Sequence, residues 1–323
     1  MRQLPAFNAL ACTLLGLAGG IACAQEYPQK PIRLIVPFPP GGGTEPLARM
    51  LAQKLPEVFG QQIIVDNRPG AGTTIGAELA AKSPADGYTL LLSSIANAIS
   101  AGLYRKLNYD LVRDIAPITL LATTSGVLVA HPTLPVKNVR DLIALAKARP
   151  GELAYSSAGS GTPNHLSAEL FNMLAGVKMI HVPYKGGGPS VIALLSGETP
   201  LSFASTPSAL QYIRAGRMHA LAVTTAQRLP SLPALPTIAE SGVPGYAAET
   251  WYGLSAPART PEKIIARLHA ETVKAYAGAD VREKLDAMGY TVRTTTPEEY
   301  GALVRSEVDK WQKVIKSANM AVD

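Results

Sequence analysis

The sequence predicts an α/β protein whose parallel sheets are covered by helices on both faces. Short runs rich in Val, Ile and Leu alternate along the chain with segments whose apolar residues follow the helical period. The apolar runs are nearly continuous, which is typical of parallel strands buried on both faces. At 323 residues, the chain is long for one domain and sufficient for two.

The expected elements follow one another from residue 32 onward. Strands are predicted at 32–38, 62–67, 88–94, 126–132, 153–159, 179–186, 201–206 and 220–225. Helices are predicted at 45–60, 73–82, 138–148, 163–176 and 189–197, where small and aliphatic residues recur at helical spacing. The proline-rich stretch 228–246 cannot form regular structure. Three helices, opened by Thr260-Pro261, Asp280 and Thr296, close the chain.

The N-terminal segment has the features of a secretory signal peptide. It contains one charged residue, Arg2, and an apolar stretch at 9–22 that ends in the small-x-small motif Ala22-Cys23-Ala24. We therefore expect residues 1–24 to be removed by cleavage after Ala24 and the mature protein to lie in the periplasm. Lipid attachment at Cys23 is the alternative. Both cysteines of the chain fall in this segment.

Composition argues against two classes of partner. The chain is 47% hydrophobic and 17% charged, with a formal net charge of +6 spread along its length. No run of lysines and arginines is interleaved with aromatic residues, so nucleic acid is not expected as a partner. After the N-terminal segment no stretch reaches 18 apolar residues, so we expect no membrane span in the mature protein.

Four glycine-rich loops each join a predicted strand to a predicted helix. We call them the first loop (39–44, PPGGGT), the second (69–74, PGAGTT), the third (158–163, AGSGTP) and the fourth (186–189, GGGP). Such loops leave backbone N–H groups unpaired at helix N-termini, where the helix dipole favours anions. In an open α/β sheet they gather at the carboxyl ends of the strands. The pattern indicates an anion site, although any single loop could be only a tight turn.

The sequence does not contain the motifs of dinucleotide, P-loop phosphate, catalytic or metal sites. The GxGxxxG run at 70–76 is one residue longer than the dinucleotide fingerprint, and Lys185 precedes its glycines, unlike the lysine of a P-loop. GxSxG, HExxH and paired SxxK and KTG motifs are absent, and the histidines lack metal-ligand spacing. We therefore expect no cofactor, no metal and no catalysis. The alternative is an exported hydrolase or lyase of carboxylic acids.

Several segments, taken together and in order, resemble the substrate-binding receptors of tripartite tricarboxylate transporters, also called Bug proteins. They include VPFPPGGGTEPLAR, VDNRPGAGTTIGAELAAKSPADGYTLL, SSAGSGTPNHLSAELF, VPYKGGGPSVIALLSGE and ETWYGLSAPARTPEKII. The resemblance extends from about Tyr27 to the last helix. It implies a periplasmic binding protein-like fold, in which two doubly wound α/β domains are joined by strand hinges and hold a carboxylate in the cleft between them.

The resemblance also implies a partner and a domain division. The receptor would deliver a di-, tri- or aromatic carboxylate to integral membrane permease subunits, and we expect it to be a monomer. A ligand-sensing accessory of a membrane kinase is an alternative role. From the chain order, residues 25–124 with 229–323 would form one domain and 125–228 the other. The apolar stretch 115–132 would be one crossing strand.

The candidate ligand-binding residues come from the four loops and their flanks. Backbone N–H groups are expected from Gly42, Gly43, Gly72, Thr73, Gly161 and Gly188, and hydroxyls from Thr44, Thr73, Ser157 and Thr162. Phe38, Tyr184 and Trp251 would line the apolar part, and Glu45, Thr74, Ser94, His165 and Ser205 complete the set. Glu45 stands where the family commonly has Asp. The nearest cations, Arg68 and Lys185, are expected to contribute less than the loops.

Overall fold

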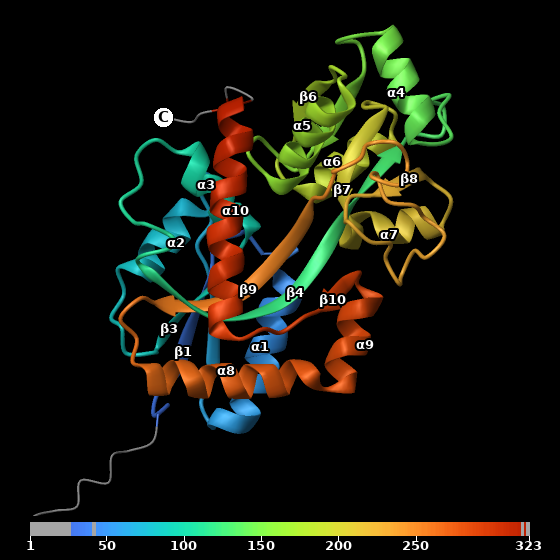
Figure 1. Cartoon of the computed structure of the whole chain (residues 1–323). Helices are drawn as coiled ribbons and strands as arrows, with labels where there is room; N and C mark the ends of the chain where they lie inside the picture. Colours follow the sequence, from blue (N-terminus) through green and yellow to red (C-terminus); the bar gives the residue numbers. More distant parts are fainter. Residues whose placement is uncertain (1–26, 41–42, 318–319, 321–323) are drawn as a thin grey trace, which may run out of the picture.

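The computed structural model describes residues 27–40, 43–317 and 320. The predicted signal peptide and Gly42 lie outside the described residues. The chain forms two α/β lobes connected by two long strands (Figure 1). Within the described residues, no helix combines the length and apolar character needed to cross a membrane.

The first lobe contains the N-terminal elements and the C-terminal helices. It is built from β1 (Ile32–Val36), α1 (Glu45–Phe59), β2 (Ile63–Asn67), α2 (Thr74–Ala81), β3 (Thr89–Ser94), α3 (Ile95–Leu103), α8 (Glu262–Ala277), α9 (Ala279–Ala287), β10 (Tyr290–Val292) and α10 (Pro297–Ser317). The predicted strand–helix alternation is confirmed here, because each predicted segment has an observed counterpart within a few residues.

The second lobe contains the middle of the chain. Its elements are α4 (Val139–Ala148), β5 (Ala154–Ser157), α5 (Pro163–Ala175), β6 (Ile180–Pro183), α6 (Gly187–Leu195), β7 (Leu201–Ser205), α7 (Thr206–Arg214) and β8 (His219–Val223). β4 (Ile115–Ala130) enters this lobe from the first, and β9 (Glu249–Pro257) returns.

The described strands form one mixed sheet in the order β2-β1-β3-β9-β4-β7-β5-β6, with β8 and β10 also paired to β4. Pairing is parallel at the outer part of each lobe, where β1 contacts β2 and β3, and β5 contacts β6 and β7. It is antiparallel at the centre, where β9 lies between β3 and β4. The expectation of parallel sheets is corrected at this point, because a strand that crosses between lobes and one that returns must run in opposite directions.

The crossing strand β4 has 16 residues and is shared by both lobes. Its first part pairs with β9 and β10, and its second part with β7 and β8. The register with β9 shifts between Pro117 and Thr119 and again between Leu120 and Ala122. Such irregularities bend a strand, so the connection between the lobes is curved rather than flat (Figure 1).

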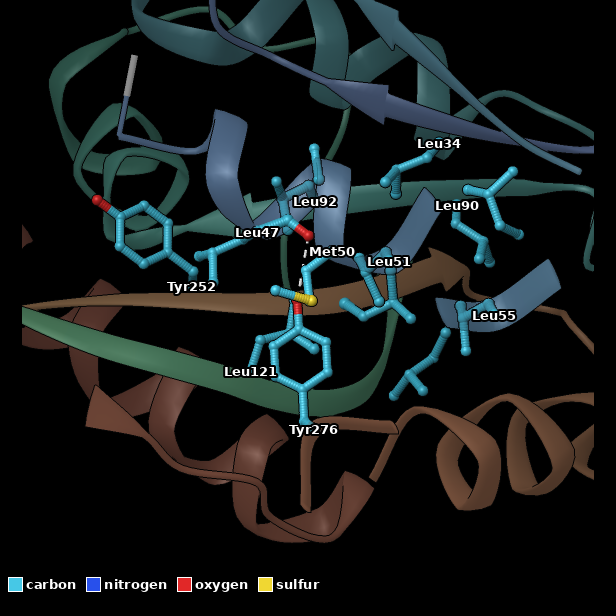
Figure 2. Packing of buried hydrophobic residues seen from close by; sticks show 14 of the residues in the cluster. Leu34, Leu47, Met50, Leu51, Leu55, Leu90, Leu92, Leu121, Tyr252 and Tyr276 are labelled. Carbon is cyan, nitrogen blue, oxygen red and sulfur yellow. Dashed lines mark hydrogen bonds between the residues drawn. The ribbon is translucent and has the colours of Figure 1, made fainter. Parts of the chain in front are cut away.

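Helix α1 shows how the sequence pattern becomes a core. Leu47, Met50, Leu51 and Leu55 recur at helical spacing and are buried against the sheet. Figure 2 shows them facing strand residues and Tyr276 of α8, whose hydroxyl donates to the Leu47 carbonyl over 3.1 Å. The helix is therefore fixed from both sides, which positions its N-terminus and the first loop.

The expected boundary between the domains at residues 228 and 229 is wrong. Ile238, Val243, Tyr246 and Ala248 pack in the core of the second lobe with β5 and β7. Leu229 packs against the opposite face of that lobe. The proline-rich segment therefore covers the second lobe, and the chain returns to the first lobe only along β9.

Candidate functional site

The first loop approaches two tyrosines of the same lobe. A Cβ atom at Gly43 would lie 3.2 Å from the Tyr252 hydroxyl and 3.6 Å from the Tyr290 hydroxyl. Tyr290 donates a hydrogen bond to the Gly43 carbonyl. Glycine is therefore favoured at this position by close approach of β9 and β10, which the sequence pattern did not reveal.

Thr44 ends the first loop at the N-terminus of α1. Its side chain is only 3% exposed, yet its hydroxyl has no partner among the described residues and does not cap the helix. A buried hydroxyl without a hydrogen bond is costly. The next residue, Glu45, forms an ion pair with Arg49 over 2.6 Å through Oε1.

The second loop is strained and is held by α3. Thr73 has φ +88°, a conformation that side-chain-bearing residues rarely adopt. The Asn97 side chain donates to the Thr73 hydroxyl over 3.0 Å and accepts from the Ser94 N–H over 2.8 Å. Ser100 donates to the Gly72 carbonyl, and Thr74 donates to the carbonyl of Ala71 over 2.8 Å. Thr73, Thr74 and Ser94 are buried; the first two side chains brace the loop, whereas the Ser94 hydroxyl caps α3 by accepting from the Ala96 N–H.

The third loop meets the first lobe. A Cβ atom at Gly161 would lie 2.5 Å from Leu103 at the end of α3, and Gly161 has φ +73°. Thr162 caps α5, since its hydroxyl accepts from the His165 N–H. Ser157 is fully buried, and its hydroxyl contacts both the N–H and the carbonyl of Gly159. Ser157 therefore holds the third loop in place through Gly159.

Two histidines lie beneath the third loop. The rings of His165 and His181 are stacked with centroids 3.7 Å apart. His165 Nδ1 accepts from the Gly161 N–H over 3.1 Å, and His181 Nε2 lies 2.6 Å from the Ser157 hydroxyl. Burial lowers the pKa of His165 to about 4. Burial and the adjacent His165 lower the pKa of His181 to about 4, so both rings are neutral at pH 7.

The fourth loop is tied to the third. The Tyr184 N–H donates to the Ser157 carbonyl over 3.1 Å, and the Gly186 N–H donates to the Ala158 carbonyl over 3.0 Å. Gly188 has open space around its Cα. Burial and the nearby Glu198 raise the pKa of Tyr184. The third and fourth loops therefore form one connected surface of the second lobe.

Ser205 lies at a pocket shared by the two lobes. This pocket is lined from the first lobe by Gly43, Pro46, Ala287, Met288 and Tyr290, and from the second by Ser205, Pro207, Ser208, Leu210, Gln211 and Arg214. Ser205 and Ser208 share a hydrogen bond of 2.7 Å. The pocket brings two predicted site residues, Gly43 and Ser205, to facing walls, and adds Arg214, which no sequence pattern singled out.

Two predicted aromatic residues belong to the first lobe. Phe38 packs partly buried against its core, and its carbonyl accepts from Asn67 over 2.9 Å. Trp251 is 2% exposed and packs edge-on against Tyr300 of α10. Because Tyr300 of α10 packs against it, the Trp251 side chain belongs to the core of this lobe and not to the surface formed by the four loops. The cation Arg68 is likewise engaged, since it pairs with Asp66 over 2.9 Å.

The arrangement offers little support for catalysis. The Ser157–His181 contact has the spacing of a nucleophile and its base. Ser157, however, has no exposed surface, and the pKa of His181 is lowered by burial to about 4. A substrate could not reach the hydroxyl in this structure. Across the described residues, no cluster of His, Cys, Asp or Glu could hold a metal ion.

A protein-family model and a curated protein both match most of this chain. The sequence model described as "Tripartite tricarboxylate transporter family receptor" matches residues 47–320. The protein BugT of Bordetella pertussis is 38% identical over 318 residues, which cover 98% of this chain and 97% of that protein.

Two solved structures are similar across nearly the whole chain. One is R. palustris Rpa4515 with adipate, at 37% identity and a TM-score of 0.84, covering 92% of this chain and 99% of that one. The other is MatC from Rhodopseudomonas palustris with bound malate, at 31% identity and a TM-score of 0.81, covering 90% and 100%.

Some residues of the site were missed from the sequence. Asn97, Ser100, His181 and Tyr290 brace the loops from elements that lie far away in the chain. His181 had a usable signal, because it is a polar residue within a predicted strand directly before the fourth loop. Asn97 had none, since a polar residue at the start of a helix is most often a local cap.

Proposed function

The chain belongs to the tripartite tricarboxylate transporter receptor family, and we propose that it captures a small carboxylate between its lobes and delivers it to a membrane permease. The fold, the family match and the carboxylates bound to two structural relatives support this proposal. Delivery would involve the integral membrane subunits of a tripartite tricarboxylate transporter. The receptor would act in the periplasm as a monomer after cleavage behind Ala24.

The observation that carries the proposal is the unpartnered Thr44 hydroxyl. It is buried at the N-terminus of a 15-residue helix, directly after the first glycine loop, and has no partner among the described residues. The positive end of the helix dipole favours a negative group there. A carboxylate oxygen would accept from this hydroxyl and remove the cost of leaving it unpaired.

The proposed ligand carries one to three carboxylates. Backbone N–H groups and the Thr44 hydroxyl would hold one carboxylate, with ordered waters filling gaps. Hydrogen bonds to a charged group contribute roughly 1.5–3 kcal/mol each, which is sufficient without a buried cation. Adipate and malate, found in the two structural relatives, set the class of compounds to test first.

Isothermal titration calorimetry tests the proposal with adipate, malate, citrate and nicotinate. Matched neutral compounds, adipamide and 1,6-hexanediol, are the negative ligands. At least one acid should bind to wild-type protein and the neutral compounds should not. Absence of binding by every acid would contradict the proposal.

Thr44 variants test whether the Thr44 hydroxyl donates a hydrogen bond to the ligand. Thr44→Val removes the hydroxyl at nearly constant volume, and Thr44→Ser keeps it. Thr44→Val should weaken binding by about tenfold or more, which corresponds to about 1.4 kcal/mol, while leaving the ligand-free melting temperature equal or higher. Thr44→Ser should bind nearly as well as wild type. Arg68→Gln serves as the control for a nearby exposed charge and should keep most of the affinity.

Two other functions are distinguished by the same protein preparation. An exported hydrolase or lyase would change the acid during incubation, which mass spectrometry of the bound compound would detect. A sensing accessory would bind the acid, but deletion of its gene would abolish a transcriptional response rather than uptake. No contact in the described structure favours either function over a receptor.

A further inference from the structure

The third loop is shaped by a stacked pair of imidazoles, one buried and one partly buried, rather than by its own glycines alone. His165 and His181 come from α5 and β6, and their rings stack with an interplanar angle of 10°. Tyr155 of β5 also stacks on His181, with ring centroids 5.2 Å apart. The loop is thus supported by a group of aromatic rings in the second lobe.

The hydrogen bond from the backbone determines the tautomer of His165. The Gly161 N–H donates to His165 Nδ1 over 3.1 Å, so Nδ1 must be unprotonated and the ring proton must be on Nε2. Nε2 lies 3.9 Å from Glu169, whose carboxylate accepts from the Tyr155 hydroxyl over 2.6 Å. One protonation state of His165 is therefore compatible with this loop.

His181 fixes the other end of the loop through Ser157. The two side chains are 2.6 Å apart, and the Ser157 hydroxyl also bridges the N–H and the carbonyl of Gly159. The hydroxyl proton is engaged inside the protein whichever partner receives it. Ser157 therefore has no proton to offer a ligand, and its contribution is to hold Gly159 in place.

The position of the loop matters because it faces the other lobe. Gly161 packs against Leu103 of α3 so closely that a Cβ atom would overlap with it. The same helix braces the second loop through Asn97 and Ser100. A small displacement of the third loop would therefore alter this contact between the lobes.

We propose that His165 and His181 are positioning residues for ligand binding: the neutral imidazole pair holds the third loop in the shape in which it meets α3 across the cleft. This inference rests on the proposed function, because it assigns these side chains to the binding of a carboxylate. Neither imidazole touches the ligand. Each acts through the backbone or hydroxyl that it holds.

The arrangement makes binding sensitive to acid. A proton on His165 Nδ1 would face the Gly161 N–H, and charging both rings would place two like charges on rings whose centroids are 3.7 Å apart. The groups that face the pair are Glu169 of α5, which favours a charged imidazole, and Tyr155 of β5, which stays neutral because burial and Glu169 raise its pKa. Affinity should fall as the pH approaches about 4.

Paired amide substitutions separate positioning from packing. His165→Asn keeps an acceptor near the Nδ1 position, whereas His165→Gln moves it toward Nε2. For His181 the relation is reversed, because the contact uses Nε2: His181→Gln keeps it and His181→Asn does not. All four variants lose the stacked ring, so each pair is matched for packing.

Calorimetry with adipate and malate at pH 7 gives the first readout. His165→Asn and His181→Gln should bind within about threefold of wild type, and His165→Gln and His181→Asn at least tenfold more weakly. Wild-type affinity should fall below pH 5, while the double variant His165→Asn with His181→Gln should show a flatter profile. Equal losses within each pair, or losses that simply follow the melting temperature, would overturn the proposal.

Hydrogen exchange at the Gly161 amide gives a readout that needs no ligand. The amide should exchange at least tenfold faster in His165→Gln than in His165→Asn. Equal exchange in the two variants would reject the positioning role even if carboxylates bind. If wild-type protein binds no carboxylate, the proposed receptor function fails by itself, and the exchange difference still decides whether the imidazoles hold the loop.

Discussion

The second and third loops have the same sequence character but are held in different ways. In the first lobe, the second loop is held by Asn97 and Ser100, side chains that do not titrate between pH 2 and 12. In the second lobe, the third loop is held by His165 and His181, which do. Two glycine loops that look equivalent along the chain therefore both contact α3 but have different chemical supports.

The difference assigns two tasks to the two lobes. The second loop stores backbone strain at Thr73, and a buried amide that satisfies two partners stabilises it. The side chains that hold this loop carry no titratable group. The third loop contacts the opposite lobe through Gly161 and depends on neutral imidazoles, so its shape can respond to acid.

The largest effect is expected from the contact that joins the two walls. Gly161→Ala adds a Cβ atom 2.5 Å from Leu103 and forces a non-glycine residue into φ +73°. We expect a loss of roughly 3 kcal/mol in the free energy of unfolding, from strain and overpacking together, with weaker carboxylate binding. Urea denaturation and calorimetry measure the two effects.

Gly176→Ala is the matched control for this substitution. Gly176 follows the C-terminus of α5, the helix that begins just after Gly161, and has φ +61°. Nothing lies within 4 Å of the position that a Cβ atom would take there. It should lose only the strain contribution, about 1 kcal/mol, and bind normally. If both variants bind equally well, the contact between Gly161 and Leu103 does not matter for the cleft.

A smaller effect is expected from the support of the second loop. Asn97→Ala leaves the Ser94 N–H without its acceptor in a site that is fully buried. The expected cost is about 2 kcal/mol in the free energy of unfolding. Asn138→Ala removes a comparable cap in an exposed place, at the N-terminus of α4, and should cost about 1 kcal/mol. Equal costs in urea denaturation would contradict the difference in burial.

The pH dependence of stability sharpens the comparison further. An unfolded histidine has a pKa near 6.5, whereas burial lowers the pKa of His165 and His181 to about 4. The unfolded chain therefore binds more protons between about pH 6.5 and pH 4, and stability must fall as the pH decreases through this window. The contribution is fully present above about pH 6.5.

The double variant His165→Asn with His181→Gln isolates this contribution. The difference in the free energy of unfolding between wild type and variant should be constant above pH 6.5 and should shrink as the pH is lowered to 4.5. A variant that removes a polar contact of the second loop, Ser100→Ala, should instead run parallel to wild type. Parallel curves for the histidine variant would show that the pair does not titrate as its burial requires.

The smallest effect is expected from the charge at the start of α1. Glu45 pairs with Arg49, whose side chain is 76% exposed. Exposed pairs of this kind contribute less than about 1 kcal/mol, so Arg49→Ala should change the melting temperature little and leave carboxylate affinity unchanged. A tenfold change in affinity would mean that Glu45 acts on the ligand and that Arg49 orients it.

The sequence by itself determined the fold class and the order of its parts. Apolar runs such as 32–38 and the spacing of Leu47, Leu51 and Leu55 are local signals, and each became the expected strand or helix. The crossing strand was also foreseen, because a single stretch from Ile115 onward is apolar over more than one strand length. The four glycine loops were identified for the same reason, because a turn is specified by neighbouring Gly and Pro residues in the sequence.

Tertiary structure decided which groups support those loops and which are free. Thr44 and Ser157 are both small hydroxyl residues at loop ends. The Thr44 hydroxyl has no partner within the described part of the chain, whereas His181 and Gly159 engage the Ser157 hydroxyl. Gly159 is a local partner of Ser157, but His181 lies 24 residues away and on another strand. Residues 229–248 belong to the second lobe for a similar reason, because their apolar side chains fill its core. The hydrophobic effect is not directional, so the sequence pattern does not show which of the two cores an apolar segment will join.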